Sequence, residues 1–75
     1  MAEGYVHTTY ADGRWANAIE GGDGAPLGTY ETKDAATRAG RGEARRRHTE
    51  HVIHNQDGTI AERNSYGDDP ADRPG

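Results

Sequence analysis

The sequence contains no cysteine and no phenylalanine, and large apolar side chains are few. Without cysteine the chain forms no disulfide bond, which many small domains use to supplement a small hydrophobic core. A chain of 75 residues buries only about 60% of the surface that its unfolded form exposes. We therefore expect a thin core, and association with a second copy is one way for such a domain to gain stability.

Long apolar runs are also missing. No segment approaches the ~20 apolar residues that a membrane-spanning helix needs, and the first ten residues, which include a Glu, a His and two Thr, do not resemble a signal peptide. The lack of cysteine fits a reducing compartment. We expect a cytoplasmic protein with no membrane role, made of one small domain over residues 1–66 and a flexible acidic tail rich in Pro and Gly over residues 67–75.

Charge is distributed unevenly along the chain. The formal net charge is −4, which does not suggest a general binder of polyanions. Between Lys33 and His48, however, six basic residues and two acidic ones give +4, so the remainder of the chain carries −8. Such local asymmetry says more about partners than the total charge does.

Two Asp-Gly pairs predict two β-hairpins, because type I′ turns need positive φ at both central residues. Asp12-Gly13 joins the segments 5–10 and 14–20, and Asp57-Gly58 joins the segments 51–55 and 59–66. Alternation along the second strand places Trp15 and Ile19 on one face, which we expect to be the core face. The sequence does not decide which face of the first strand is buried.

The segment between the hairpins predicts a helix. Residues 21–26 are rich in glycine and form a loop, and Leu27–Glu31 is either a short third strand or an extended approach to the helix. Thr32 is the expected N-cap, and Lys33–His48 the expected helix, with basic residues in its last turn as the helix dipole favours. The predicted fold is α+β, an antiparallel sheet from two hairpins with one helix packed on it, in the order β-β-(β)-α-β-β.

The helix has two distinct faces at 100° per residue. Its expected inner face holds small residues, with Glu43 fitting there only if it reaches the rim or pairs with Arg47 four residues later. Its outer face carries Arg38, Arg41 and Arg45 at i, i+3 and i+7. Guanidinium groups bind phosphate oxygens in a bidentate manner, so this stripe is a candidate nucleic-acid contact. The alternative is a solvated helix face.

Other functional patterns are weak. The aromatic residues could stack on bases, but in a chain without Phe we expect Trp15 and the four tyrosines to form the core. The histidines at 48, 51 and 54 recur every three residues, but 51 and 54 fall on a strand, where that spacing places them on opposite faces. We assign no metal site, no cofactor, no catalytic residue and no small-molecule substrate, and we expect no enzyme activity.

Several motifs resemble a known family. They are Gly13-Arg14-Trp15, Thr32-Lys33-Asp34-Ala35-Ala36, Ala39-Gly40-Arg41, Ala44-Arg45, His51-Val52-Ile53-His54, Asp57-Gly58, Ile60 and Ser65-Tyr66-Gly67-Asp68-Asp69-Pro70. Together they resemble the domain-of-unknown-function family numbered 2188, which consists of small single-domain prokaryotic proteins. The resemblance implies a fold similar to the predicted one and implies no activity.

We interpret the chain as a non-enzymatic binding module that contacts nucleic-acid phosphates through Arg38, Arg41 and Arg45. The alternative is a self-associating protein–protein module, a homodimer with no nucleic-acid role. Exposed strand edges and a thin core favour that alternative.

Overall fold

The computed structural model describes residues 4–22 and 25–66, so the predicted acidic tail lies outside the described residues. Five strands and one helix follow in the order β1 (Val6–Ala11), β2 (Arg14–Ile19), β3 (Gly28–Tyr30), α1 (Lys33–Arg47), β4 (Glu50–His54) and β5 (Ile60–Ser65). The segment whose structure the sequence left open is therefore a short strand. No helix in the described part of the chain is long and apolar enough to cross a membrane.

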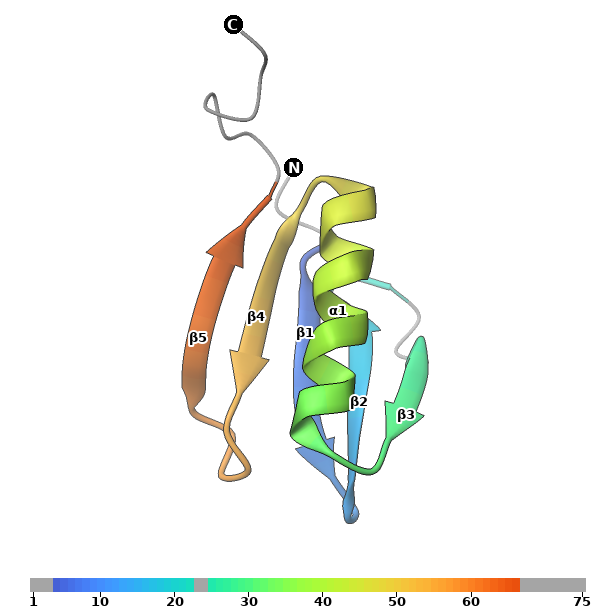
Figure 1. Cartoon of the computed structure of the whole chain (residues 1–75), viewed down its shortest axis with the longest axis vertical. Helices are drawn as coiled ribbons and strands as arrows, with labels where there is room; N and C mark the ends of the chain where they lie inside the picture. Colours follow the sequence, from blue (N-terminus) through green and yellow to red (C-terminus); the bar gives the residue numbers. More distant parts are fainter. Residues whose placement is uncertain (1–3, 23–24, 67–75) are drawn as a thin grey trace, which may run out of the picture.

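The sheet is mixed, so the prediction of a purely antiparallel sheet was wrong. Its strand order is β3-β2-β1-β4-β5. The two hairpins are antiparallel, but they meet where β1 and β4 run parallel and pair over three positions. The arrows of β1 and β4 point the same way in Figure 1. The cause is the single helical crossover, which returns the chain to the end of the sheet where β3 and β1 begin.

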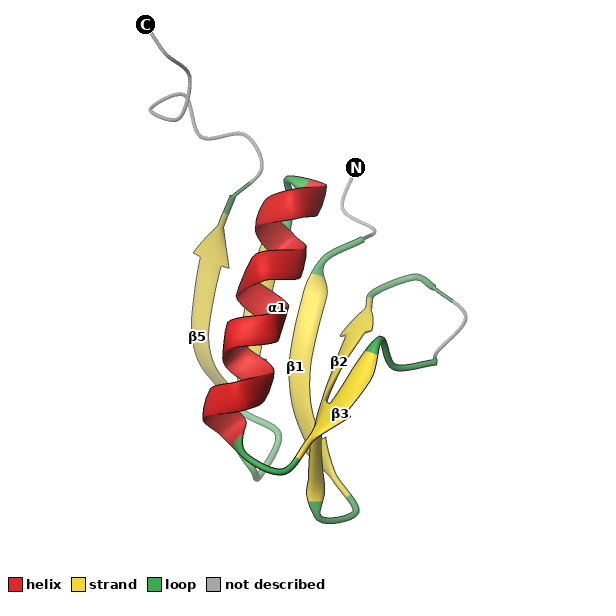
Figure 2. Ribbon diagram, turned by 45° about the vertical axis from the view of Figure 1, so that its right-hand side comes forward, coloured by secondary structure: helices red, strands yellow, loops and turns green. Residues whose placement is uncertain are grey.

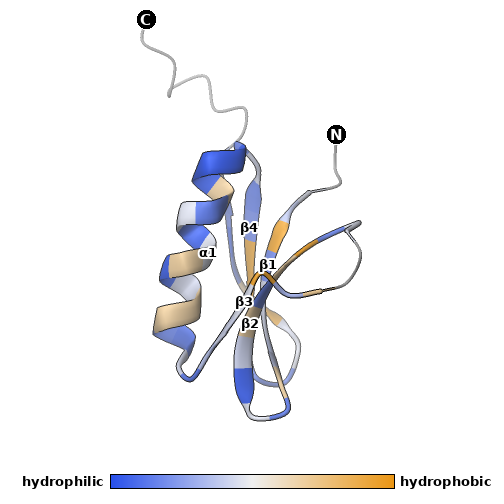
Figure 3. Ribbon diagram, turned by 90° about the vertical axis from the view of Figure 1, so that its right-hand side faces the viewer, coloured by the Kyte–Doolittle hydropathy of each residue, from blue (hydrophilic) through white to orange (hydrophobic). Residues whose placement is uncertain are grey.

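The molecule has two layers, with α1 on one face of the sheet (Figures 1 and 3). Within the described residues the helix contacts β1, β2, β3 and β4 but not β5. The turned view in Figure 2 shows β5 at the far edge of the sheet, beyond the helix. The sheet thus has a helix face and an open face, and nothing in residues 4–22 and 25–66 covers the open face with a second layer.

Both Asp-Gly hairpins form, but only the first has the expected turn. Asp12 has φ 54° and Gly13 has φ 80°, the two positive values that a type I′ turn requires. In the second hairpin only Gly58 has positive φ, at 94°. There the backbone N–H of Gly58 donates to the carbonyl of Asn55 over 2.9 Å, and the β4–β5 register shifts beside His54. The second connection is therefore a longer loop, and the extra residue at the register shift, Ala61, lies on β5.

The core is as thin as the composition predicts. Its buried apolar residues are Val6, Trp15, Ala36, Ala44, Val52 and Ile53. Leu27 and Ile60, two of the few large aliphatic side chains, are 47% and 57% exposed. The prediction that the tyrosines complete the core was wrong, because all four of them are only half-buried.

Candidate nucleic-acid interface

Capping residues set the length of α1. The Thr32 side chain accepts a hydrogen bond from the backbone N–H of Ala35 over 3.1 Å, as an N-cap does. At the other end His48 adopts the left-handed conformation with φ 56°, and its N–H bonds back to the carbonyl of Arg45. The predicted start is confirmed and the helix ends one residue before the predicted end. Three arginines at positions 45–47 occupy its last turn.

Small residues on the inner face bring α1 close to the sheet. Ala36, Gly40 and Ala44 are the buried residues of the helix. A Cβ atom added at Gly40 would lie 2.6 Å from Oδ1 of Asn17, 2.6 Å from Nε2 of His51 and 2.8 Å from Oγ1 of Thr8. No side chain larger than hydrogen fits there without a shift of these neighbours, so the glycine fixes the distance between helix and sheet.

Three buried polar side chains lie beneath Gly40, one from each of three neighbouring strands. The Thr8 hydroxyl donates to Oδ1 of Asn17 over 2.5 Å, and the amide of Asn17 donates to the carbonyl of Ala36 over 2.9 Å. Nε2 of His51 lies 2.7 Å from the same threonine oxygen. Because the threonine proton is already used, His51 must donate from Nε2. This network ties the two hairpins to the helix.

The network favours the neutral form of His51. With its proton on Nε2, the imidazole has an unprotonated Nδ1, which is buried and has no hydrogen-bond partner. A second ring proton would therefore be placed in the core with no acceptor. Burial lowers the pKa of His51, and the positive charge of Arg41 lowers it further.

The predicted arginine stripe lies on the side of α1 that faces away from the sheet. Arg38, Arg41 and Arg45 are all exposed. Nε of Arg38 pairs with Oδ2 of Asp34 at 3.2 Å, where both side chains are more than three-quarters exposed. In residues 4–22 and 25–66, Arg41 and Arg45 have no ion-pair partner. The structure therefore brings the three candidate residues together and leaves two of their guanidinium groups available.

The remaining arginines of the helix have a different role. Glu43 accepts hydrogen bonds from both Arg46 and Arg47, and its Oε2 lies 2.7 Å from Nε of Arg47. The bond from Arg47, together with that from Arg46, lowers the pKa of Glu43. Of the two ways in which the sequence allowed Glu43 to fit the inner face of the helix, the pairing with Arg47 is present. The guanidinium groups of Arg46 and Arg47 are engaged by Glu43 and are therefore less available to a ligand than those of Arg41 and Arg45.

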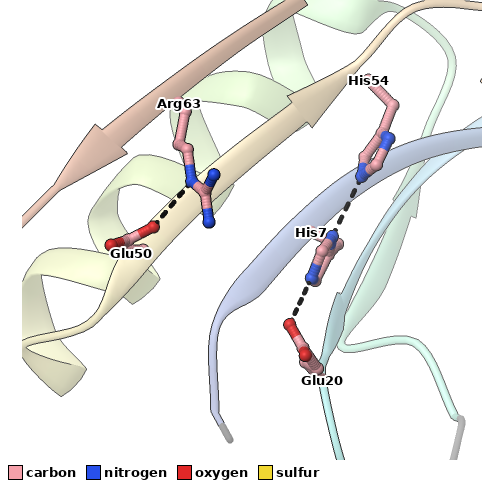
Figure 4. Close-up of polar contacts among 5 residues, drawn as sticks. All are labelled: His7, Glu20, Glu50, His54 and Arg63. Atoms are coloured by element: carbon pink, nitrogen blue, oxygen red, sulfur yellow. Dashed lines mark hydrogen bonds and ion pairs between the residues drawn. The ribbon is translucent and has the colours of Figure 1, made fainter. Parts of the chain in front are cut away.

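A second polar cluster, which the sequence did not reveal, lies on the open face of the sheet (Figure 4). It links Glu20, His7 and His54 in one chain, and Glu50 with Arg63 in an ion pair of 2.9 Å. The alternation of the strands did indicate that His51 and His54 face opposite sides. The contact of His54 with His7 depends on the parallel β1–β4 pairing, which the sequence did not predict.

Among residues 4–22 and 25–66, no group of three or more His, Cys, Asp or Glu side chains has an arrangement that could hold a metal ion. The exposed side chains of the helix include guanidinium groups, which bind phosphate or carboxylate oxygens.

Comparisons with known proteins place the chain in a family without assigning an activity. Neither a search of curated proteins nor a search of solved structures finds a significant match. A family model does match residues 6–66, which span all five strands and the helix. The chain belongs to the DUF2188 family, described as uncharacterised proteins conserved in bacteria.

Proposed function

We propose that the protein is a non-enzymatic binding module that contacts nucleic-acid phosphates through Arg38, Arg41 and Arg45. The observation that supports this most is that Arg41 and Arg45 are exposed, lie on one helix face and have no ion-pair partner in the described residues. All the N–H donors of an unpaired arginine remain available to a ligand.

The spacing of the stripe suits a linear array of phosphates. An α-helix rises about 1.5 Å per residue, so Arg41 and Arg45 are separated by ~6 Å along the helix axis and Arg38 and Arg45 by ~10 Å. Each guanidinium can form two parallel hydrogen bonds to a phosphate. Because Gly40 packs directly on the sheet, the helix is a rigid support that holds the stripe in a fixed orientation.

The charge distribution predicts weak, oriented and salt-sensitive binding. The helix region carries +4 and the rest of the chain −8, so the attraction of a nucleic acid to the helix is opposed by the net charge of the remaining chain. Two or three phosphate contacts correspond to a slope of about −2 to −3 in a plot of log K against log salt concentration for duplex DNA.

The test is a fluorescence-anisotropy titration of the full chain with short duplex DNA and with single-stranded RNA, at low and at physiological salt. The variant is Arg41→Ala/Arg45→Ala, and the matched control is Arg46→Ala/Arg47→Ala, which removes the same charge from the same helix. We expect the first pair to lose ~10-fold or more in affinity, as the loss of two charge-assisted contacts implies. The control is expected to lose less, because its guanidinium groups are engaged by Glu43.

Equal losses in the two double variants would mean that only net charge matters and would contradict an oriented site. No binding at low salt would remove the nucleic-acid role altogether. In that case the alternative, self-association into a homodimer, gains support from the uncovered strand β5 and the 57% exposure of Ile60. A melting temperature that rises with protein concentration would then identify the homodimer.

A further inference from the structure

The open face of the sheet carries a chain of three polar contacts through two histidines, and Figure 4 draws the two that involve His7. Nε2 of His7 lies 2.8 Å from Oε1 of Glu20. Nδ1 of the same ring lies 2.9 Å from Nε2 of His54, and the two rings stack with centroids 5.2 Å apart. Nδ1 of His54 lies 3.3 Å from the carbonyl oxygen of Gly58. The chain therefore runs from the end of β2 across β1 and β4 to the β4–β5 loop.

This chain of contacts ends in a hydrogen-bond acceptor on each side, and the two acceptors fix the number of ring protons that the histidines must carry. A carboxylate oxygen at one end requires a proton on Nε2 of His7, and a carbonyl oxygen at the other requires one on Nδ1 of His54. The central contact requires a third proton, on Nδ1 of His7 or on Nε2 of His54. Two neutral imidazoles carry only two ring protons. All three hydrogen bonds form only when the two imidazoles together carry three ring protons and therefore one positive charge.

We propose that His7 and His54 form a proton-binding site that takes up a single proton and shares it between two strands. The carboxylate of Glu20 balances the charge and makes the contact with His7 a charge-assisted hydrogen bond. Loss of the proton leaves one of the three hydrogen bonds unmade. Addition of a second proton sets two N–H groups against each other at the central contact, so the pair resists it.

The surroundings of the pair leave Glu20 as its counterion. Strand alternation and register place these titratable or charged residues on the open face or in the adjoining loop: Tyr5, Arg14, Glu20, Glu50, Asp57 and Arg63. Glu50 is paired with Arg63, and Asp57 accepts hydrogen bonds from Thr59. On the helix face of β4 lies the buried His51, whose pKa is lowered further by positive charge on His7.

The site acts on the seam between the two halves of the sheet. β1 and β4 pair over only three positions, Val6 to Thr8 with His51 to Ile53, and the histidine contact adds a side-chain link across that short ladder. Its proton occupancy therefore changes how firmly the two hairpins are joined. The site lies on the face opposite to α1, so it does not depend on the proposed nucleic-acid function.

The test follows the imidazole nitrogens of the full chain by NMR across the histidine titration range. We expect the signals of His7 and His54 to change together in two separated steps, one for each proton, as interacting sites do. His48, whose side chain lies on the exposed helix end, is followed in the same sample for comparison. Independent one-step titrations of His7 and His54 would overturn the proposal.

Two matched substitutions test the counterion. Glu20→Gln keeps an acceptor oxygen but removes the charge, and we expect it to move the upper step to lower pH by about half a unit. Glu50→Gln removes a carboxylate from the same face that bonds Arg63 instead, and its effect should be smaller. Both side chains lie at the surface, and the dispersion of the amide signals reports that each variant is folded. An upper step that stays in place in Glu20→Gln would contradict the proposal.

Discussion

At the scale of single residues, the buried His51 links the stability of the fold to pH. Its ring donates to Thr8 from Nε2 while the buried Nδ1 has no partner. The core therefore favours the neutral form, and burial lowers the pKa of this histidine. The buried histidine therefore opposes folding at any pH at which the same residue is protonated in the unfolded chain.

The sign of the pH dependence follows directly. Because the folded pKa of His51 lies below the unfolded value of about 6.5, the unfolded chain binds a proton first as the pH falls. The free energy of unfolding should decrease from about pH 6.5 downward, by at most ~1.4 kcal/mol per pH unit, until the lowered folded pKa is reached. Urea unfolding across this range measures it.

The comparison of His51→Gln with His48→Gln isolates that contribution. Glutamine at position 51 retains a donor toward Thr8 and does not titrate, so part of the decrease in acid should disappear. The same change at the exposed His48 should leave it in place. If the free energy of unfolding decreased with the same slope in the wild type and in His51→Gln over this pH range, other groups, such as the His7–His54 pair, would carry the acid dependence.

At the scale of elements, α1 depends on packing more than on its own helix propensity. It contains two interior glycines, each of which costs about 1 kcal/mol relative to alanine in a free helix. The two sit in opposite environments. Gly40 is buried against three polar side chains, whereas Gly42 is exposed, and a Cβ atom added to it would have no neighbouring atom within 4 Å.

These environments predict opposite effects of the same substitution. Gly42→Ala should stabilise the protein by up to ~1 kcal/mol, because it improves helix propensity and meets no neighbour. Gly40→Ala should destabilise it by about 1–3 kcal/mol, since the added methyl would overlap the Thr8–Asn17–His51 network. Chemical denaturation of both variants gives the comparison. A stabilised Gly40→Ala protein would show that the helix can move away from the sheet at little cost.

Local signals in the sequence predicted the elements well, and pairing between distant elements was the part that failed. The N-cap at Thr32, the turn at Asp12-Gly13 and the small inner face of α1 each depend on residues close in sequence. The parallel β1–β4 pairing depends on where the helical crossover returns the chain. Without that pairing, neither the network of His51 with Thr8 nor the contact of His54 with His7 could be foreseen.

In the candidate site, too, the features that depend on residues close in sequence were the ones that could be predicted. The outer position of Arg38, Arg41 and Arg45 follows from helical periodicity alone, and all three residues are exposed. The difference between the unpaired Arg41 and the paired Arg47 is partly local as well, because Glu43 lies four residues before Arg47. Whether this surface binds phosphate is a matter for the titration, since family membership assigns no ligand.

At the scale of the whole molecule, two hairpins and one helix share a single thin core, and Thr8 stands at its centre. It belongs to the N-terminal hairpin, bonds His51 of the C-terminal hairpin and, through Asn17, joins the helix. With so few buried apolar side chains, we expect neither hairpin to be stable alone, and the domain to unfold in one step.

Thr8→Val tests that view, because valine matches threonine in shape and lacks only the hydroxyl. The substitution leaves Oδ1 of Asn17 and the Nε2–H of His51 buried without partners, at a cost of about 1–3 kcal/mol for each. The matched control, Thr9→Val, changes a half-buried residue on the same strand that faces the open side and should alter stability by no more than ~0.5 kcal/mol. Amide hydrogen exchange should show both hairpins of the Thr8→Val protein losing protection by the same factor, about 30-fold or more. Loss of protection in only one hairpin would mean that the two halves open separately, and that the seam between β1 and β4, where the histidine pair also sits, is the weakest part of the fold.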